Sequence, residues 1–366
     1  MNVDKRKLII ISGGGTGGPS MAPLALAVAY QKLNPEARFA FFGNDKNLDK
    51  SLFTGSLEKL QAEYFAFPSG KLRRYFSWRN FSDVIKIIVA FFLVLKKLKQ
   101  LKPDLIISAG SFASVPVVWA GRMLSIKSLV HQQDIRPGLA NRLMAPIATK
   151  ISVCFDSSLT DYDQKAVLIG NPSEAMQVTE EMKVAVRNKF KLKTDQPLLL
   201  ITGGATGALA INKLIFVALP YLSSDLQILH LAGQGKYEQA PVEENYQVYA
   251  QVLQSDFLAL MACANIVVSR AGLGALTLLS HLAKPSIIIP IPHSHQEANA
   301  NYFQAKEAAI IVDQESLDGK KLAELINDLE KNIEKKEQLS KSIAEILPRD
   351  AATNGAKIMA EMLALK

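Results

Sequence analysis

The chain has 366 residues, of which 49% are hydrophobic and 21% charged, and its formal net charge is +8. A single hydrophobic core stops growing near about 250 residues, so this length predicts two domains. The composition excludes a disulfide-stabilised secreted domain and offers no metal-ligand cluster, because the 2 cysteines, Cys154 and Cys263, lie far apart in apolar contexts, which favours a reducing compartment.

The first half of the chain alternates short apolar runs with helical patterns. The apolar run from Leu8 to Ile11 is too short for a signal peptide and is expected to be a cytoplasmic first strand. A helix from about Ser20 to Lys32 follows, and a second helical segment extends through Leu101. The strands expected around them are ARFAFFG, PDLIISAG, KSLVHQQ and KISVCF. This alternation predicts an α/β domain with a parallel sheet covered on both faces.

The same alternation restarts after Gly170-Asn171-Pro172 and a charged helix that ends near Lys193. Its expected strands are PLLLITGG, LQILHLAG, YQVYAQVL, ANIVVSRAG, KPSIIIPIP and AAIIVDQ. Two similar units are therefore predicted: residues 1–165 with 349–366, and residues 166–348. In this division the last helix, residues 351–365, crosses back onto the first domain.

Glycine-rich turns follow the first strand of each half, at residues 13–18 and at Gly203-Gly204. A helix that starts after such a turn presents free backbone N–H groups at the positive end of its dipole, which is a site for an anion. A packing turn without a ligand is the alternative. The order GGGTGG lacks the dinucleotide spacing, and no acidic residue clearly ends the second strand, so a nucleotide-sugar diphosphate suits these turns better than NAD.

Four stretches resemble the MurG-type N-acetylglucosaminyltransferases, in that family's order. They are GGGTGG at 13–18, HQQD at 131–134, GNP at 170–172, and SRAG with KPSIIIPIP…HQEANA at 269–300. The resemblance implies the GT-B fold, in which two Rossmann-like domains with parallel sheets face an interdomain cleft. The first domain would meet a lipid acceptor, and the second would hold UDP-N-acetylglucosamine. It also implies an inverting transfer that uses neither a metal nor a cofactor.

The resemblance carries donor and diphosphate contacts onto particular residues. The first glycine loop would border the diphosphate and donor sugar, the second would lie near the uridine diphosphate, and Gln296 would help to hold the donor. Arg270 and Gly272 would place a helix start facing the donor diphosphate. The implied positions are Thr16, Gly17, Gly18, Asp134, Gly203, Gly204, Arg270, Gly272 and Gln296.

Several positions depart from the family's pattern. Pro19 stands where a histidine usually closes the first loop, and Leu278 stands where a glutamate is expected to grip the ribose hydroxyls. Gln132, Glu174 and Ala205 replace a carboxylate, an arginine and a serine. The loss of the ribose acceptor should weaken or redirect uridine-sugar binding by about 1 to 3 kcal/mol for each unpaired polar contact.

The transfer needs a base that takes a proton from the acceptor hydroxyl, and Asp134 and His131 are the catalytic candidates. The alternatives are that His131 is a satisfied structural residue and that Asp134 caps a helix beginning near Pro137. His293, His295 and Glu297 form another polar cluster, for which ordinary loop chemistry is favoured over metal binding.

The segment from Gly70 to Lys102 mixes cations with aromatic and aliphatic residues, which suits an anionic membrane surface. Its apolar run, Ile87 to Leu95, is too short to span a bilayer. We expect the helix from Val84 to Leu95 to be largely buried and the loop from Leu72 to Phe81 to face lipid. The candidate membrane-facing residues are Arg73, Arg74, Tyr75, Trp78 and Phe81. No nucleic-acid-binding signature accompanies the positive charge.

These features predict a peripheral enzyme of peptidoglycan synthesis on the cytoplasmic face of the cell membrane. It would add N-acetylglucosamine from UDP-N-acetylglucosamine to an undecaprenyl-diphosphate-linked N-acetylmuramyl peptide. Two alternatives remain open: a catalytically weak relative that binds lipid intermediates or partners, and a transferase or epimerase of the same fold that uses another nucleotide sugar.

Overall fold

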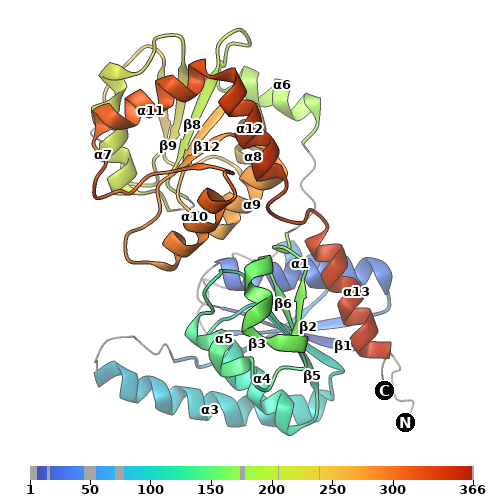
Figure 1. The fold of residues 1–366 in the computed structure, drawn as a ribbon. Coiled ribbons are helices and arrows are strands. Elements are labelled where there is room, and N and C mark those ends of the chain that lie inside the picture. Colours follow the sequence, from blue (N-terminus) through green and yellow to red (C-terminus); the bar gives the residue numbers. More distant parts are fainter. Residues whose placement is uncertain are drawn as a thin grey trace. The chain divides into compact units, whose positions relative to one another are not determined.

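The computed structural model describes residues 6–14, 17–44, 55–70, 78–173, 178–204, 206–238 and 240–364, and at 17–18 and 78–82 it describes the backbone alone. The chain forms two compact units (Figure 1). Unit 1 comprises residues 1–175 and 348–366, and unit 2 comprises residues 176–347.

Unit 1 contains a seven-stranded sheet in the order β3-β2-β1-β4-β5-β6-β7, and its described pairings are parallel. The strands are β1 (Leu8–Ser12), β2 (Arg38–Asn44), β3 (Glu63–Phe67), β4 (Leu105–Ser108), β5 (Lys127–Gln132), β6 (Lys150–Val153) and β7 (Ala166–Leu168). Successive side chains point to opposite faces of the sheet, so Ile9 and Ile11 enter one core and Ile10 enters the other.

Helices cover both faces of this sheet. They are α1 (Gly17–Leu33), α3 (Trp78–Leu101), α4 (Ser114–Met123), α5 (Leu139–Met144) and α13 (Ala351–Ala364), with short 3-10 turns η1 (Asp156–Asp161) and η2 (Asp163–Lys165). The α1 and α13 side chains share the core of Ile9 and Ile11, whereas α3, α4 and α5 pack on the side of Ile10. The expected return of the last helix is confirmed, because α13 packs on α1.

Unit 2 contains a six-stranded parallel sheet in the order β10-β9-β8-β11-β12-β13. Its strands are β8 (Leu198–Thr202), β9 (Gln227–Leu231), β10 (Tyr246–Tyr249), β11 (Ile266–Ser269), β12 (Ser286–Ile288) and β13 (Ile310–Ile311). The helices are α6 (Glu180–Lys189), α7 (Leu209–Ala218), α8 (Gln254–Cys263), α9 (Leu273–His281), α10 (His295–Ala305), α11 (Gly319–Lys331) and α12 (Ile333–Ala344), with the turn η3 (Leu219–Tyr221). The predicted pair of parallel-sheet α/β domains is thus confirmed.

The boundary between the units differs from the predicted one. Residues 166–175 lie in unit 1, although the sequence pattern places them in the second domain. The reason is β7, which pairs with β6 through Ile151 opposite Ala166 and so extends the first sheet. Pro348 also belongs to unit 1, where its carbonyl lies against Gly170, one residue outside the predicted limit.

The expectation of a largely buried helix from Val84 to Leu95 is wrong. Only one side of α3 faces the core, through Ala90, Val94 and Leu98. The other side exposes apolar side chains to solvent, among them Ile88 at 51% and Phe92 at 62%. Trp78 and Phe81 lie on the helix backbone rather than in a loop, and their side chains, like Arg73, Arg74 and Tyr75, fall outside what the structure describes. In the described part of the chain, no helix is long and apolar enough to cross a membrane.

Candidate functional site

The strand order reverses once in each sheet, between β1 and β4 in unit 1 and between β8 and β11 in unit 2. In open parallel sheets the ligand crevice lies outside the carboxyl ends of the strands at such a reversal. Gly13 directly follows β1, Gly203 follows β8, and Arg270 follows β11. The two glycine loops and Arg270, which were singled out from the sequence, therefore lie at the points where the topology favours a ligand.

The first glycine loop is closely packed against the start of α1. A Cβ atom at Gly13 would lie 2.6 Å from the Ser20 hydroxyl, so the position has room for glycine only. Ser20 is buried, and its hydroxyl has no hydrogen-bond partner among the described residues. Gly17 and Gly18 form the first turn of α1, where backbone N–H groups are free to bind an anion. Thr16 lies outside the described residues.

The loop after β4 joins this site through a contact that the sequence did not suggest. The Ser12 hydroxyl at the end of β1 donates to the Ser114 hydroxyl at the start of α4, over 3.2 Å. The Ser108 hydroxyl accepts from the N–H of Gly110 at 3.3 Å and tightens the turn between them. The run SAGSFAS between a buried strand and a helix is the signal that could have identified this loop.

His131 is fully buried at the end of β5. Its Nδ1 lies 3.0 Å from the Ser152 hydroxyl on β6, and its Nε2 has no described partner. Burial lowers the pKa of His131 to about 3, with an opposing contribution from the hydrogen bond at Ser152. A neutral, enclosed imidazole is suited to hold β5 and β6 together, so the geometry favours the structural interpretation of His131.

Asp134 is half-buried in the loop after β5. It does not cap the following helix, because α5 begins after Gly138 and has no side-chain cap. The neighbouring Gln132 is fixed by two contacts: its Nε2 donates to the Ile135 carbonyl at 3.1 Å, and the Tyr162 hydroxyl donates to its Oε1. The loop that carries Asp134 is therefore held in place by the amide that replaces the family's carboxylate.

The HQQD and GNP segments, which appear in the sequence only as successive stretches, contact each other. The Gln133 side chain donates to the Asn171 side chain at 3.4 Å. Gly170 has a φ of +86°, and a Cβ there would lie 2.8 Å from the Pro348 carbonyl, which explains the glycine. Glu174 lies outside the described residues.

The second glycine loop turns sharply after β8. A Cβ at Gly203 would lie 2.3 Å from the backbone nitrogen of Ala208, and Gly204 has a φ of +87°. The N–H of Gly204 donates to the Thr202 hydroxyl at 3.2 Å. Ala205 lies outside the described residues. This turn leads into α7, as an anion-binding turn of a nucleotide fold does.

Arg270 holds neighbouring loops together in unit 2. Its guanidinium donates to the carbonyls of Ile289 and Pro290 at 2.9 and 3.0 Å and to the Gln314 side chain at 2.7 Å. Burial lowers the pKa of Arg270. With only 7% of its surface exposed, Arg270 acts through the loop after β12 rather than as a free cation.

Gln296 and Gly272 come together at two helix starts. A Cβ at Gly272, the residue before α9, would lie 3.8 Å from Nε2 of Gln296 in the first turn of α10. The Oε1 of Gln296 accepts the N–H of Ile291 at 3.2 Å, which leaves its amide group aimed toward α9. Two positive helix ends and one amide donor thus converge beside the switch point of unit 2.

A buried polar network supports the loop after β9 and was missed in the sequence. His230 is 3.1 Å from the Asn212 side-chain oxygen and 2.8 Å from the Tyr246 hydroxyl. Asn212 then donates to the carbonyls of Ala232 and Lys236, both at 3.0 Å. The signal was present, because a histidine in LQILHLAG and an asparagine in LAINKLIF interrupt otherwise apolar runs.

The cluster of His293, His295 and Glu297 makes local contacts. The N–H of His293 donates to the Glu297 carboxylate at 3.0 Å, and the His293 ring lies 3.7 Å from the Glu315 carboxylate. Both histidines are exposed. Among the residues with a described position, no three His, Cys, Asp or Glu side chains form a group that could hold a metal ion.

The buried histidines predict an acid-sensitive fold. Burial lowers the pKa of His131 in unit 1 to about 3 and that of His230 in unit 2 to about 4. In the unfolded chain the histidine pKa values are about 6.5, so that state binds more protons than the folded one. The contribution of the neutral histidines to stability is therefore fully present above about pH 6.5 and is lost as the pH falls. Between about pH 7.5 and about pH 5, each unit should lose about 2 kcal/mol of its free energy of unfolding.

Urea unfolding followed by tryptophan fluorescence measures this loss for unit 1, because both tryptophans, Trp78 and Trp119, belong to it. The His131→Asn variant should be less stable at neutral pH and should lose most of the pH dependence. His295→Asn, at an exposed position, is the control and should behave as the parent protein does. A pH dependence that survives in His131→Asn would show that other groups cause it.

Comparisons with known proteins agree with this geometry. The glycosyltransferase family 28 N-terminal domain model matches residues 9–153, and the C-terminal domain model of the same family matches residues 198–357. The chain is 34% identical over 333 residues to the UDP-N-acetylglucosamine–N-acetylmuramyl-(pentapeptide) pyrophosphoryl-undecaprenol N-acetylglucosamine transferase of Clostridium botulinum strain Kyoto, covering 89% of this chain and 92% of that one. The transferase of the same name from Lachnoclostridium phytofermentans is 33% identical, covering 88% and 90%.

Solved structures show the same fold. The crystal structure of Acinetobacter baumannii MurG matches with a TM-score of 0.78 at 23% identity, covering 97% of this chain and 99% of that one. The UDP complex of S. aureus MnaA matches with a TM-score of 0.72 at 12% identity, covering 97% of both chains. The GT-B architecture expected from the sequence is confirmed.

Proposed function

We propose, because this chain belongs to glycosyltransferase family 28, that it transfers N-acetylglucosamine from UDP-N-acetylglucosamine to an undecaprenyl-diphosphate-linked N-acetylmuramyl peptide. The observation that carries the proposal is the 34% identity to a transferase of that name over 89% of the chain. The glycine loops at the switch points of both sheets support it, because they offer backbone amides to diphosphates.

In the proposed reaction an acceptor hydroxyl oxygen attacks the anomeric carbon of the donor sugar. The bond from that carbon to the uridine diphosphate breaks, and the diphosphate leaves with the electron pair. The hydroxyl proton passes to the carboxylate of Asp134. Amides at the starts of α7, α9 and α10, with Gln296, stabilise the charge that develops on the leaving diphosphate. No step requires a metal ion.

The test is a transfer assay with the purified protein, radiolabelled UDP-N-acetylglucosamine and a short-chain lipid-linked acceptor. Incorporation of label that depends on both substrates supports the proposal. Incorporation only with another nucleotide sugar would retain the fold and replace the donor. No product with any donor, although the donor still binds, would favour the second candidate below.

The second candidate is a catalytically weak binder of lipid intermediates. Pro19 favours it, because a proline in the first turn of α1 offers neither an acid nor a hydrogen-bond donor where the family usually has histidine. A thermal-shift titration with UDP-N-acetylglucosamine beside the transfer assay separates binding from turnover.

Leu278 leads to a prediction of improved donor binding. It is half-buried in α9, the helix that begins at the donor side of the site, and it replaces the expected ribose-binding glutamate. Leu278→Glu should lower the KM for UDP-N-acetylglucosamine by about tenfold, since a hydrogen bond to a charged group contributes about 1.5 to 3 kcal/mol. Leu278→Gln, isosteric and uncharged, is the matched control and should gain less. An unchanged KM in Leu278→Glu would place the ribose elsewhere.

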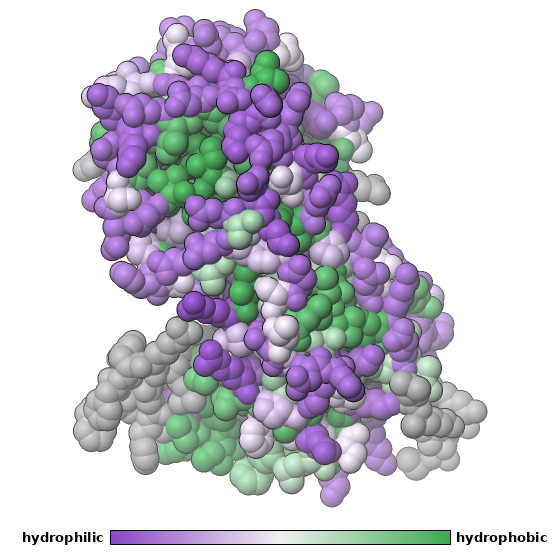
Figure 2. All heavy atoms as spheres, viewed as in Figure 1, coloured by the Kyte–Doolittle hydropathy of each residue, from purple (hydrophilic) through white to green (hydrophobic). Residues whose placement is uncertain are grey.

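The exposed side of α3 supports attachment to a membrane surface. The apolar face consists of Val84, Ile85, Ile88, Val89, Phe92 and Leu93 on α3, with Trp119 and Met123 on α4, and each is more than two-fifths exposed. Hydrophobic residues gather at the foot of unit 1 in Figure 2, where Figure 1 draws α3. A patch of this kind with cations along the same helix is typical of a protein that lies in the interface of an anionic bilayer. We assign it to the cytoplasmic face of the cell membrane, where a lipid-linked acceptor would be met.

A further inference from the structure

A pocket of about 480 Å³ lies at the amino-terminal edge of the first sheet, away from the carboxyl ends that carry the glycine loop. Lys7 precedes β1, Asp104 precedes β4, and Lys127 begins β5. The last turns of α3 and α13 also line it, through Lys99 and Met362 among others, and so does the segment between α4 and β5. The proposed transfer uses none of these residues.

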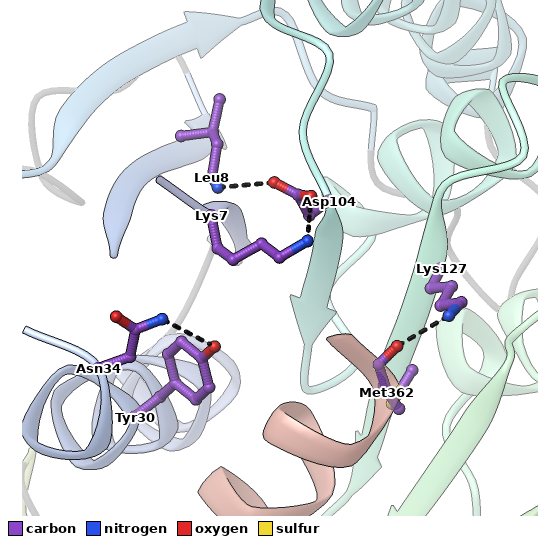
Figure 3. A network of polar contacts seen from close by, with 7 residues as sticks. All are labelled: Lys7, Leu8, Tyr30, Asn34, Asp104, Lys127 and Met362. Carbon is purple, nitrogen blue, oxygen red and sulfur yellow. Dashed lines mark hydrogen bonds and ion pairs between the residues drawn. The ribbon is translucent and has the colours of Figure 1, made fainter. Parts of the chain in front are cut away.

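The pocket carries an excess of positive charge. Its lining includes Lys7, Lys99, Lys102, Lys127 and a single carboxylate, Asp104. That carboxylate is already engaged, since it accepts from Lys7 Nζ at 3.0 Å and from the N–H of Leu8 at 2.9 Å (Figure 3).

Lys127 donates to the Met362 carbonyl at 2.8 Å, which satisfies the end of α13. Lys99 and Lys102 have no ion-pair or hydrogen-bond partner for their ammonium groups in the described part of the chain. The two ammonium groups of Lys99 and Lys102 therefore remain uncompensated within the described residues. Such a pocket complements an anion that accepts several hydrogen bonds, as a phosphate does.

The remaining wall is apolar and continues toward the membrane-attachment surface. Leu98, Leu124 and Ile126 line the pocket beside the lysines. Lys99 follows Phe92 by seven residues on α3, so both project from the same side of the helix. The apolar face thus ends at the pocket, which favours an anion attached to an apolar chain over a small soluble one.

We propose that this pocket binds the phosphate of an anionic phospholipid headgroup when the apolar face lies on a bilayer. The proposal rests on the membrane attachment proposed above. The headgroup would fix the rotation of unit 1 on the surface, because one end of α3 would be tied to a phosphate while the apolar side chains enter the interface.

Two variants of α3 test the proposal. Lys99→Gln removes one charge from the pocket, and Lys96→Gln removes one from an exposed position one turn earlier that does not line it. Binding is measured with phosphatidylcholine vesicles, with and without phosphatidylglycerol. Lys99→Gln should weaken binding to the phosphatidylglycerol vesicles by about ten- to a hundredfold, as expected for a lost hydrogen bond to a charged group. Lys96→Gln should weaken it by about fivefold at most, the effect of one near-surface charge.

Lysine acylation read by mass spectrometry locates the contact in the unaltered protein. Phosphatidylglycerol vesicles should protect Lys99 and Lys102, whereas phosphatidylcholine vesicles should not, and Lys320 in unit 2 should react equally in both. Equal losses of vesicle binding in Lys99→Gln and Lys96→Gln would show that the lysines act only through diffuse attraction to the anionic surface. That result would overturn the proposal. Protection by glycerol 3-phosphate without vesicles would overturn the lipid as the source of the phosphate.

These outcomes are separable from failure of the proposed function. Suppose that changes to the apolar face abolish vesicle binding while Lys99→Gln and Lys96→Gln do not differ. That result would reject headgroup binding by the pocket and would leave membrane attachment in place. Vesicle binding that does not depend on the apolar face would remove membrane attachment. The transfer assay with a short-chain acceptor in detergent reports on the reaction without either surface.

Discussion

Replacing Asp134 by asparagine is expected to lower the kcat of N-acetylglucosamine transfer by about 10²- to 10⁴-fold, the usual contribution of a positioned general base. Asparagine keeps the shape of the side chain but cannot take the proton from the hydroxyl group of the acceptor substrate. The KM for the donor should change little, because the proposed reaction gives Asp134 the proton and leaves the diphosphate to the helix starts of unit 2. A large rise in KM would instead support the donor contact that the resemblance implies for Asp134. Initial rates at saturating concentrations of both substrates measure the effect.

The control for this experiment is Asp161→Asn. Asp161 is exposed and ends the 3-10 turn η1, which follows β6 in the same unit. Both variants remove one carboxylate from unit 1, so a shared effect would come from net charge. A kcat in Asp134→Asn equal to that of the control would exclude Asp134 as the base. His131 would not replace it, since its ring is enclosed.

The double substitution Ile88→Asp with Phe92→Asp should reduce partitioning onto anionic vesicles by at least about 100-fold. Burial of one such side chain contributes about 1.5 to 3 kcal/mol, and two carboxylates add repulsion from the anionic surface. Both side chains are exposed in the structure, so the fold should tolerate the change. Co-sedimentation with vesicles measures the partitioning.

The matched control places the same charges on unit 2, as Val184→Asp with Ile333→Asp. These side chains are also exposed, on α6 and α12. The control should bind vesicles nearly as the parent protein does, and both variants should retain transfer to a detergent-solubilised acceptor. Equal partitioning of the two double variants would show that α3 does not contact the membrane.

The interior strands were predictable because parallel strands buried on both faces are continuous apolar runs. β1 and β8, with every residue buried, stand out in the sequence. The two strands that were missed, β3 and β7, form the outer edges of the first sheet. β3 is partly exposed and β7 has only three residues, so neither produces a long apolar run. The misplaced domain boundary followed directly from the missing β7.

The character of α3 could not be deduced from hydropathy. Its buried residues, such as Val94, alternate with exposed residues of the same kind, such as Leu93. A helix that is apolar around most of its circumference satisfies the pattern of a core helix and of an interfacial helix equally well. Only the packing against the sheet shows that one side has no protein cover within the described residues.

The candidate site, like the fold, has features that could be predicted from the sequence and features that could not. Glycines at strand ends are visible in the sequence because backbone geometry demands them, as at Gly13 and Gly203. The state of a polar side chain depends on neighbours distant in sequence. His131 is enclosed beside Ser152, and Arg270 is committed to carbonyls on another loop. No local pattern reports those partners.

The packing of α13 on α1 affects the order in which the two units can fold during translation. Leu26 of α1 fits against Gly355 of α13, where a Cβ would lie 2.1 Å from the leucine side chain. The first unit therefore lacks part of its covering until the final helix has been synthesised, after the whole of the second unit. In the nascent chain, an apolar side of α1 would therefore stay uncovered during most of translation, and chaperones recognise such surfaces. The second unit would be the first to finish folding.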